Sequence, residues 1–167
     1  MVRALITSVV AGLIGEPATD GVAAAAVIMG SIVTFLDFFD GWFARRTNMS
    51  SAFGARFDME VDALLIQVLA ILVWAHGKAG PWAILSGLLR YIFVAAGWLW
   101  PWMQRPLFFS QRRRVICVVQ IAGLVLALAP AIVPPLSAIL AAVSLAALLY
   151  SFLADTLWLW KRRHAVT

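Results

Sequence analysis

Apolar residues fill six stretches of this chain, and short polar segments separate them. A short stretch covers about 2–14, and the five longer ones cover about 21–44, 57–76, 81–102, 113–130 and 136–160. Runs of roughly 20 apolar residues are typical of helices that cross a membrane. The pattern therefore predicts an all-α polytopic membrane protein with six transmembrane helices, folded as a single domain over residues 1–167.

The first predicted helix is short for a membrane span. About 14 residues rise roughly 21 Å along a helix, whereas the hydrocarbon core of a bilayer is about 30 Å thick. The helix is therefore truncated at its start, tilted into the interface, or set in a thinned bilayer. Of these explanations we favour a missing N-terminal piece.

Composition and charge add an orientation to this fold. Hydrophobic residues make up 63% of the chain, against about half in a soluble domain. If six helices alternate, all of the 13 lysines and arginines except Lys78 and Arg90 fall on one side. Since cytoplasmic loops carry the excess of positive charge, we expect both termini in the cytoplasm. No nucleic-acid motif accompanies the net charge of +5, and the single Cys117 excludes an internal disulfide.

Four carboxylates interrupt the second and third apolar stretches. Asp37 and Asp40 belong to the run D-F-F-D-G-W-F-A-R, and Asp58 and Asp62 to G-A-R-F-D-M-E-V-D. Helical spacing puts each pair on one face, so two facing helices would gather four anionic groups. Carboxylates this close cannot all stay ionised without cations, and at membrane depth they are usually functional. The cluster therefore predicts a site for a hard divalent ion, Mg²⁺ or Mn²⁺.

The carboxylates belong to a longer pattern of fixed spacing, D-x2-D-G-x2-A-R-x8-G-x3-D-x3-D. The chain matches it at every fixed position with Asp37, Asp40, Gly41, Ala44, Arg45, Gly54, Asp58 and Asp62. This run resembles the signature of the CDP-alcohol phosphotransferase family (class I CDP-alcohol phosphatidyltransferases), integral membrane enzymes of phospholipid synthesis. The signature occupies only residues 37–62, and the six apolar stretches are its only support elsewhere.

The resemblance implies an activity with its partners. By the resemblance, the protein is expected to form a six-helix homodimer, surrounded by membrane lipids, with a polar cavity open to the cytoplasm. They transfer a substituted phosphate from a CDP-linked donor, here expected to be CDP-diacylglycerol, to an alcohol acceptor and release CMP. By this likeness two Mg²⁺ or Mn²⁺ ions would be held by Asp37, Asp40, Asp58 and Asp62, and Asp62 would also be the general base on the acceptor hydroxyl.

The same likeness assigns residues to the donor. The two glycines would let the nucleotide approach the backbone, and the arginine would contact its phosphates. The expected donor-binding residues are Thr34, Gly41, Ala44, Arg45, Ser51 and Gly54.

Basic residues outside the signature are the candidates for the acceptor. Arg90 lies inside the fourth stretch, where it either contacts an acceptor phosphate or pairs with the carboxylate cluster. Arg112, Arg113 and Arg114 open the fifth, where they either bind a phosphorylated acceptor or anchor the chain to anionic headgroups. Ser110, Arg114 and Gln120 loosely resemble the S-x3-K-x5-Q pattern of phosphatidylglycerophosphate synthases. These arginines favour a phosphorylated polyol, glycerol 3-phosphate or an inositol phosphate.

One position argues against glycerol 3-phosphate. The synthases tend to carry Lys directly after the last aspartate, and this chain has Ala63.

Other functions fit parts of the pattern. The carboxylates could form a proton relay, or structural ion pairs with Arg45 and Arg56, or the cation site of a membrane transporter. Against a transporter, the helices that carry the motif show no interruption of the broken-helix kind. A catalytically divergent family member is the remaining alternative.

Overall fold

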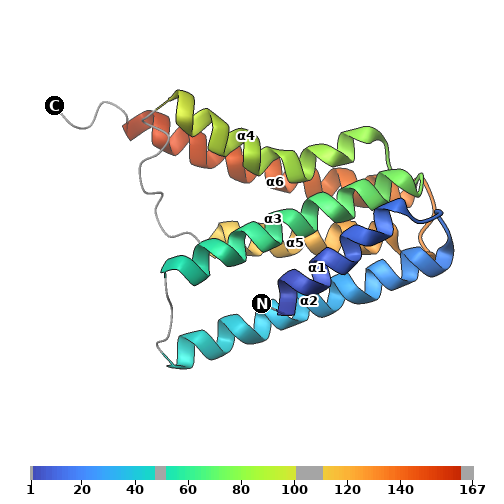
Figure 1. Cartoon of the computed structure of the whole chain (residues 1–167). Helices are drawn as coiled ribbons and strands as arrows, with labels where there is room; N and C mark the ends of the chain where they lie inside the picture. The colour runs from blue at the N-terminus through green and yellow to red at the C-terminus, as the bar shows by residue number, and fades with distance from the viewer. Residues whose placement is uncertain (1, 48–51, 101–110, 163–167) are drawn as a thin grey trace.

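The computed structural model is a bundle of six α-helices (Figure 1), and it describes residues 2–47, 52–100 and 111–162. The helices are α1 (Val2–Gly12), α2 (Asp20–Thr47), α3 (Ala52–Ala75), α4 (Leu85–Leu99), α5 (Gln111–Leu128) and α6 (Leu136–Arg162). Two 3-10 turns, η1 (Leu13–Gly15) and η2 (Pro81–Ile84), follow α1 and precede α4. No strand occurs within these described ranges, so the prediction of an all-helical fold is confirmed there.

The two helices of the signature are longer than the sequence predicted. α2 ends at Thr47 rather than at about 44, and α3 begins at Ala52 rather than at about 57. Ala52 and Ala55 favour a helix, which offsets the cost of about 1 kcal/mol for a glycine in a helix. As a consequence Gly54 belongs to α3 and lies one helical turn before Asp58.

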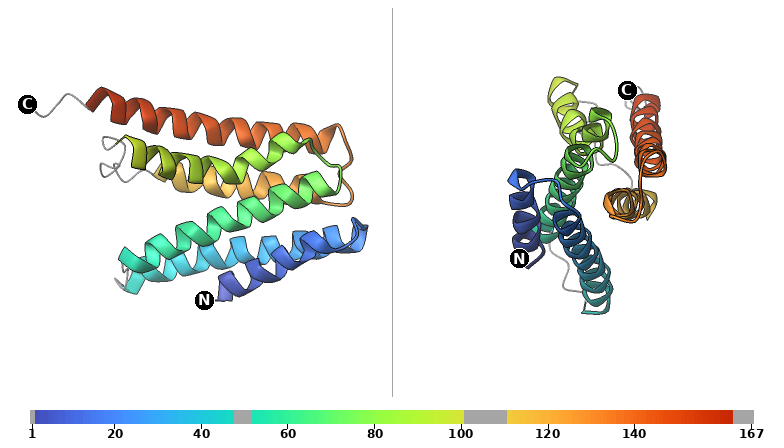
Figure 2. Two further views of the ribbon diagram at one scale, coloured as in Figure 1. Left: turned by 45° about the horizontal axis from the view of Figure 1, so that its top comes forward. Right: turned by 90° about the vertical axis from the view of Figure 1, so that its right-hand side faces the viewer.

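Helix α3 lies at the centre of the bundle and contacts α1, α2, α4 and α5. Its leucines Leu65, Leu69 and Leu72 are fully buried, and they form one core with Leu124 and Leu128 of α5. Figures 1 and 2 show α4 beside α6, α3 beside α5, and the short α1 beside α2. The core therefore fixes the position of α3, whose N-terminal half carries Asp58 and Asp62.

Successive helices run in opposite directions, so the bundle has two distinct ends. The signature end, at the left of Figure 1, gathers the C-terminal ends of α2, α4 and α6 and the N-terminal ends of α3 and α5. At the opposite end Lys78 Nζ donates to the carbonyl oxygens of Ala129 and Ile132 at 3.3 and 2.6 Å. Ser137 Oγ in turn donates to the Lys78 carbonyl oxygen at 2.6 Å. The ammonium of Lys78 therefore caps carbonyls that follow α5, as a cation at a helix C-terminus can.

Two helical segments in the described part of the chain are long and apolar enough to cross a membrane, Pro81–Leu99 and Leu136–Trp160. Only 22% and 33% of their most apolar windows are buried inside the bundle, so most residues of these windows keep some exposed surface. Three shorter apolar helical segments are Val2–Gly15, Asp20–Leu36 and Val115–Leu128. An outward apolar surface of this extent is what a bilayer would cover.

Candidate functional site

One face of α3 presents Gly54, Asp58 and Asp62 at intervals of one helical turn. The side chain of Asp58 is 55% exposed and that of Asp62 is 21% exposed. Residue 54 has no side chain, so nothing from that position extends over the carboxylate one turn later. The face can therefore admit a ligand to both carboxylates.

Helix α2 carries the other half of the signature. It contains five signature residues, which the helical period places on one side: Asp37, Asp40, Gly41, Ala44 and Arg45. Their side chains lie outside the described part of the structure, as does the whole of Ser51. Thr34 precedes Asp37 by one turn, and its half-buried hydroxyl donates to the Gly30 carbonyl oxygen at 2.8 Å. Because this bond uses the hydroxyl proton, Thr34 could meet a ligand only as an acceptor.

Arg3 of α1 reaches both carboxylates of α3. Its guanidinium donates from Nη1 to Asp58 Oδ1 at 3.1 Å and from Nη2 to Asp62 Oδ1. The Arg3 side chain is only 6% exposed, so it meets the carboxylates from their buried side. From the sequence, Arg3 was predicted only to contribute to the charge that orients the chain. The signal was its place as the only charged residue in the first apolar stretch, where an arginine must find a partner.

Arg90 of α4 is paired with Glu60 rather than with a signature aspartate among the described side chains. Nη2 of Arg90 donates to Glu60 Oε1, and Nε donates to Oε2 at 3.4 Å. Glu60 lies between Asp58 and Asp62 in the sequence, but the helical period turns it away from their face and toward α4. The pair therefore connects α4 to the segment of α3 that carries the carboxylates.

Gln120 and Asp155 are among the polar residues that lie buried within apolar helices. Gln120 of α5 is fully buried, and neither its Oε1 nor its Nε2 has a hydrogen-bond partner among the described residues. Asp155 of α6 is also buried; it interrupts an apolar run but was not among the residues predicted from the sequence. A buried polar group without a hydrogen-bond partner is uncommon in proteins. Gln120 is therefore available to a ligand that reaches the interior.

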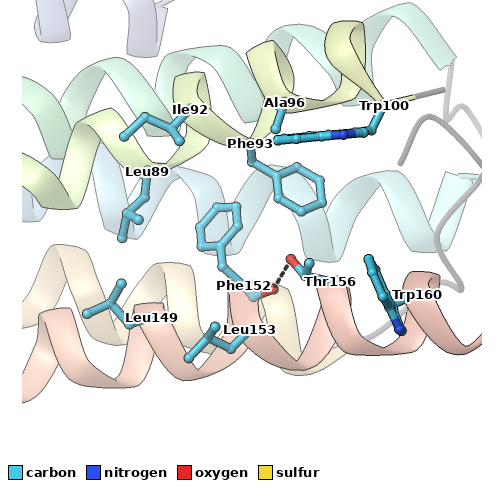
Figure 3. A pocket seen from close by; sticks show the side chains of 10 residues that line it. All are labelled: Leu89, Ile92, Phe93, Ala96, Trp100, Leu149, Phe152, Leu153, Thr156 and Trp160. Atoms are coloured by element: carbon cyan, nitrogen blue, oxygen red, sulfur yellow. Dashed lines mark hydrogen bonds between the residues drawn. The ribbon is translucent and has the colours of Figure 1, made fainter. Parts of the chain in front are cut away.

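Helices α4 and α6 line an open apolar pocket of about 640 Å³. The side chains that line it are shown in Figure 3, with Trp100 and Trp160 where both helices approach the signature end. Thr156 donates its hydroxyl to the Phe152 carbonyl oxygen at 2.8 Å, so this polar side chain is satisfied within α6. The rings of Phe93 and Phe152 meet at 5.4 Å between centroids. Walls of this kind suit an apolar ligand and offer little to a polar one.

Arg112, Arg113 and Arg114 lie in the first turn of α5, at the signature end of the bundle. Their side chains lie outside the described residues. Their backbone position places three cations at the same end as the carboxylates of α3. The predicted partner of these arginines is a phosphorylated acceptor or anionic headgroups.

Comparison with known proteins gives a family match over most of the chain. Residues 1–154 match the family model described as CDP-alcohol phosphatidyltransferase. Over 82 residues the chain is 34% identical to the CDP-diacylglycerol--glycerol-3-phosphate 3-phosphatidyltransferase of Escherichia coli (strain K12) and 36% identical to that of Shigella flexneri serotype 5b (strain 8401). Each alignment covers 47% of this chain and 43% of the relative, so the match spans less than half the length of these curated relatives. No solved structure matches significantly.

Proposed function

Because the chain belongs to the CDP-alcohol phosphatidyltransferase family, we propose that it transfers a phosphatidyl group from CDP-diacylglycerol to an alcohol and releases CMP. The observation that carries this proposal lies on one face of α3. There Asp58 and Asp62 are one helical turn apart, and both contact the guanidinium of Arg3. The spacing of Asp37 and Asp40 on α2 supplies the second half of the signature at the same end of the bundle.

The donor set fits a hard divalent ion. Within the described side chains no group of three or more histidines, cysteines or acids forms a metal site. The two carboxylates of α3 nevertheless already hold a cation, the guanidinium of Arg3, and oxygen-only ligands suit Mg²⁺ or Mn²⁺. We assign Asp37, Asp40, Asp58 and Asp62 as ligands of two such ions. When bound, the ions would neutralise negative charge on the donor's pyrophosphate.

The remaining signature residues would place the donor and activate the acceptor. Asp62 would accept the proton of the acceptor hydroxyl, whose oxygen forms the new bond to the phosphorus that carries diacylglycerol. The bond from that phosphorus to CMP breaks, and CMP leaves. Arg45 and Ser51 would hold donor phosphates, while Thr34, Gly41, Ala44 and Gly54 would line the nucleotide site.

A phosphorylated polyol is the acceptor class that the cationic residues support. Arg112, Arg113 and Arg114 begin α5 at the signature end, and the buried amide of Gln120 lies about two turns further along the same helix. Arginine is the side chain best suited to hold a phosphate by paired hydrogen bonds. Arg90 would join this site by exchanging Glu60 for an acceptor phosphate. The relatives are named for glycerol 3-phosphate, whereas Ala63 still distinguishes this chain from the synthases with Lys at that position.

The pocket between α4 and α6 would receive an acyl chain of the donor. The segments Pro81–Leu99 and Leu136–Trp160, which contain α4 and most of α6, are long and apolar enough to cross a membrane, and the walls of the pocket are mostly hydrocarbon and aromatic surface. Leu89 and Phe93 line it on either side of Arg90 in the sequence, so the pocket adjoins the pair that links α4 to α3. A lipid bound there would extend toward the signature end.

The whole chain would act as one membrane domain over residues 1–167. Its six helices would cross the membrane with both termini and the signature end in the cytoplasm, because the lysines and arginines concentrate at that end. By the family likeness two copies would form a homodimer.

Chelation tests the proposed chemistry. Transfer, measured as CMP release from CDP-diacylglycerol by purified protein in detergent, should disappear in EDTA and return when Mg²⁺ or Mn²⁺ is added in excess. Protein kept in EDTA already saturated with Mg²⁺ controls for effects of the chelator itself. Transfer that survives thorough chelation would contradict the assignment of the four aspartates to metal ions.

A further inference from the structure

Arg3 makes the buried side of the carboxylate pair on α3 a cation site in its own right. The guanidinium contacts one oxygen of Asp58 and one of Asp62, and it is almost completely enclosed. Its backbone carbonyl accepts a hydrogen bond from the Thr7 hydroxyl at 2.9 Å, and α1 packs against both α2 and α3. The arginine is therefore fixed in place by the fold rather than extended from a flexible end.

We propose that Arg3 is a counter-cation that holds Asp58 and Asp62 when no divalent ion is bound and competes with that ion for their oxygens. This inference rests on the proposed function, because it takes these two aspartates as metal ligands. It adds a role for α1, which carries none of the signature residues.

Electrostatics predicts in which direction the loss of Arg3 changes the affinity for a divalent ion. Two carboxylates one turn apart on a helix repel each other, and a partly buried pair needs a nearby positive charge to remain ionised. A guanidinium supplies this charge at any physiological pH, since arginine does not lose its proton in proteins. The same charge repels a divalent ion a few ångströms away and occupies oxygens that the ion would use. Removing it should therefore tighten ion binding.

The competition can be measured as Mn²⁺ affinity of the full chain in detergent, from the loss of the free-ion signal in electron paramagnetic resonance. Arg3→Gln removes the charge but keeps a hydrogen-bonding side chain, and it should bind Mn²⁺ at least about fivefold more tightly than wild type. Arg3→Lys keeps the charge and should stay within about twofold. Lys78→Gln, a matched loss of one positive charge at the opposite end of the bundle, should leave the affinity unchanged.

A second measurement needs no variant and covers the case in which Arg3→Gln does not fold. Saturating Mg²⁺ should speed amide hydrogen exchange in α1 of the wild-type protein, because Arg3 loses carboxylate partners. Slower exchange, or equal or weaker Mn²⁺ binding by folded Arg3→Gln, would overturn the inference and leave the proposed function standing. Absence of any Mn²⁺ binding by wild type would overturn both.

Discussion

Asp58 and Asp62 are chemically identical but differ in surroundings, and this difference suggests a division of roles. Asp58 is the more exposed, at 55% against 21% for Asp62, and both share the guanidinium of Arg3. A general base benefits from an environment from which water is largely excluded, because water then does not compete with the reacting hydroxyl for the carboxylate. The less exposed Asp62 therefore suits the base, whereas Asp58 is open to an ion arriving from the exposed side.

Replacing Asp62 by asparagine tests the role of the base. Asp62→Asn keeps the shape of the side chain but removes its capacity to accept a proton, so kcat for CMP release should fall by roughly 10²-fold or more. Asp20→Asn makes the same chemical change in the first turn of α2 at the opposite end of the bundle, and it should leave kcat unchanged. Folded Asp62→Asn protein, checked by gel filtration and circular dichroism, with undiminished kcat would exclude Asp62 as the base.

The signature residues could be predicted from the sequence because they are close in it, and helical spacing alone puts them on two faces. Arg3 could not, because its contact with Asp62 joins residues 59 positions apart and depends on how α1 packs. The Arg90–Glu60 pair likewise joins residues that are far apart in the sequence, by 30 positions. Sequence reasoning recognised that Arg90 needs a partner or a cavity, but only the packing of α4 against α3 selects Glu60.

At the scale of elements, small residues decide where helices meet closely. A Cβ added at Gly123 of α5 would lie 2.6 Å from Ser144 Cβ of α6, and one at Gly87 of α4 would lie 2.6 Å from Gln67 Cα of α3. Such contacts are typical of helices that pack in membranes without a hydrophobic driving force between them. Further along α4 the larger side chains of Leu89, Ile92 and Phe93 line the open apolar pocket between α4 and α6.

Filling this pocket tests its assignment to an acyl chain. Ala96→Phe places a ring among the lining residues and should raise the KM for a long-chain CDP-diacylglycerol roughly tenfold, the effect of losing burial of about two methylene groups at about 0.8 kcal/mol each. The KM for a short-chain donor should change little. Ala95→Phe adds the same ring at a neighbouring exposed position outside the lining. Equal effects of the two variants, or equal effects on both donors, would remove the acyl chain from the pocket.

The helix boundaries show how accurately the local sequence pattern predicts where a helix begins and ends. All six apolar stretches form helices, yet α3 starts about five residues earlier than predicted. The segment S-S-A-F-G-A-R contains serines and a glycine, which favour turns, and the prediction followed them. Two alanines and the packing of α3 against its neighbours outweigh the preference of Gly54, and this extension is what brings Gly54 onto the same helix face as the carboxylates.

For the whole molecule, the two ends of the bundle differ in charge in a way that predicts its orientation. Among the described residues, Lys78 is the only lysine or arginine in the connections opposite the signature end, and its ammonium caps carbonyls after α5. Alternation of six helices could be predicted from the apolar stretches and this charge distribution. The lengths of the apolar helical segments could not, since five long stretches were predicted and, within the described residues, two segments, Pro81–Leu99 and Leu136–Trp160, are long and apolar enough to cross a membrane.

Accessibility of single cysteines tests this orientation. In a Cys117→Ala background, Glu16→Cys lies at an exposed position of the end opposite the signature, and Thr47→Cys ends α2 at the signature end. A membrane-impermeant maleimide should label the cysteine at position 16 in intact cells and the cysteine at position 47 only after lysis. Labelling of position 47 in intact cells would reverse the proposed orientation.

The central claim is phosphatidyl transfer from CDP-diacylglycerol, and CMP release tests it most directly. Purified full chain in detergent would receive CDP-diacylglycerol, Mg²⁺ and one alcohol at a time: glycerol 3-phosphate, an inositol phosphate, or their unphosphorylated counterparts glycerol and inositol. We predict CMP release that requires an acceptor and occurs with a phosphorylated polyol. No release with any acceptor, from folded protein that binds Mn²⁺, would contradict the proposed transfer.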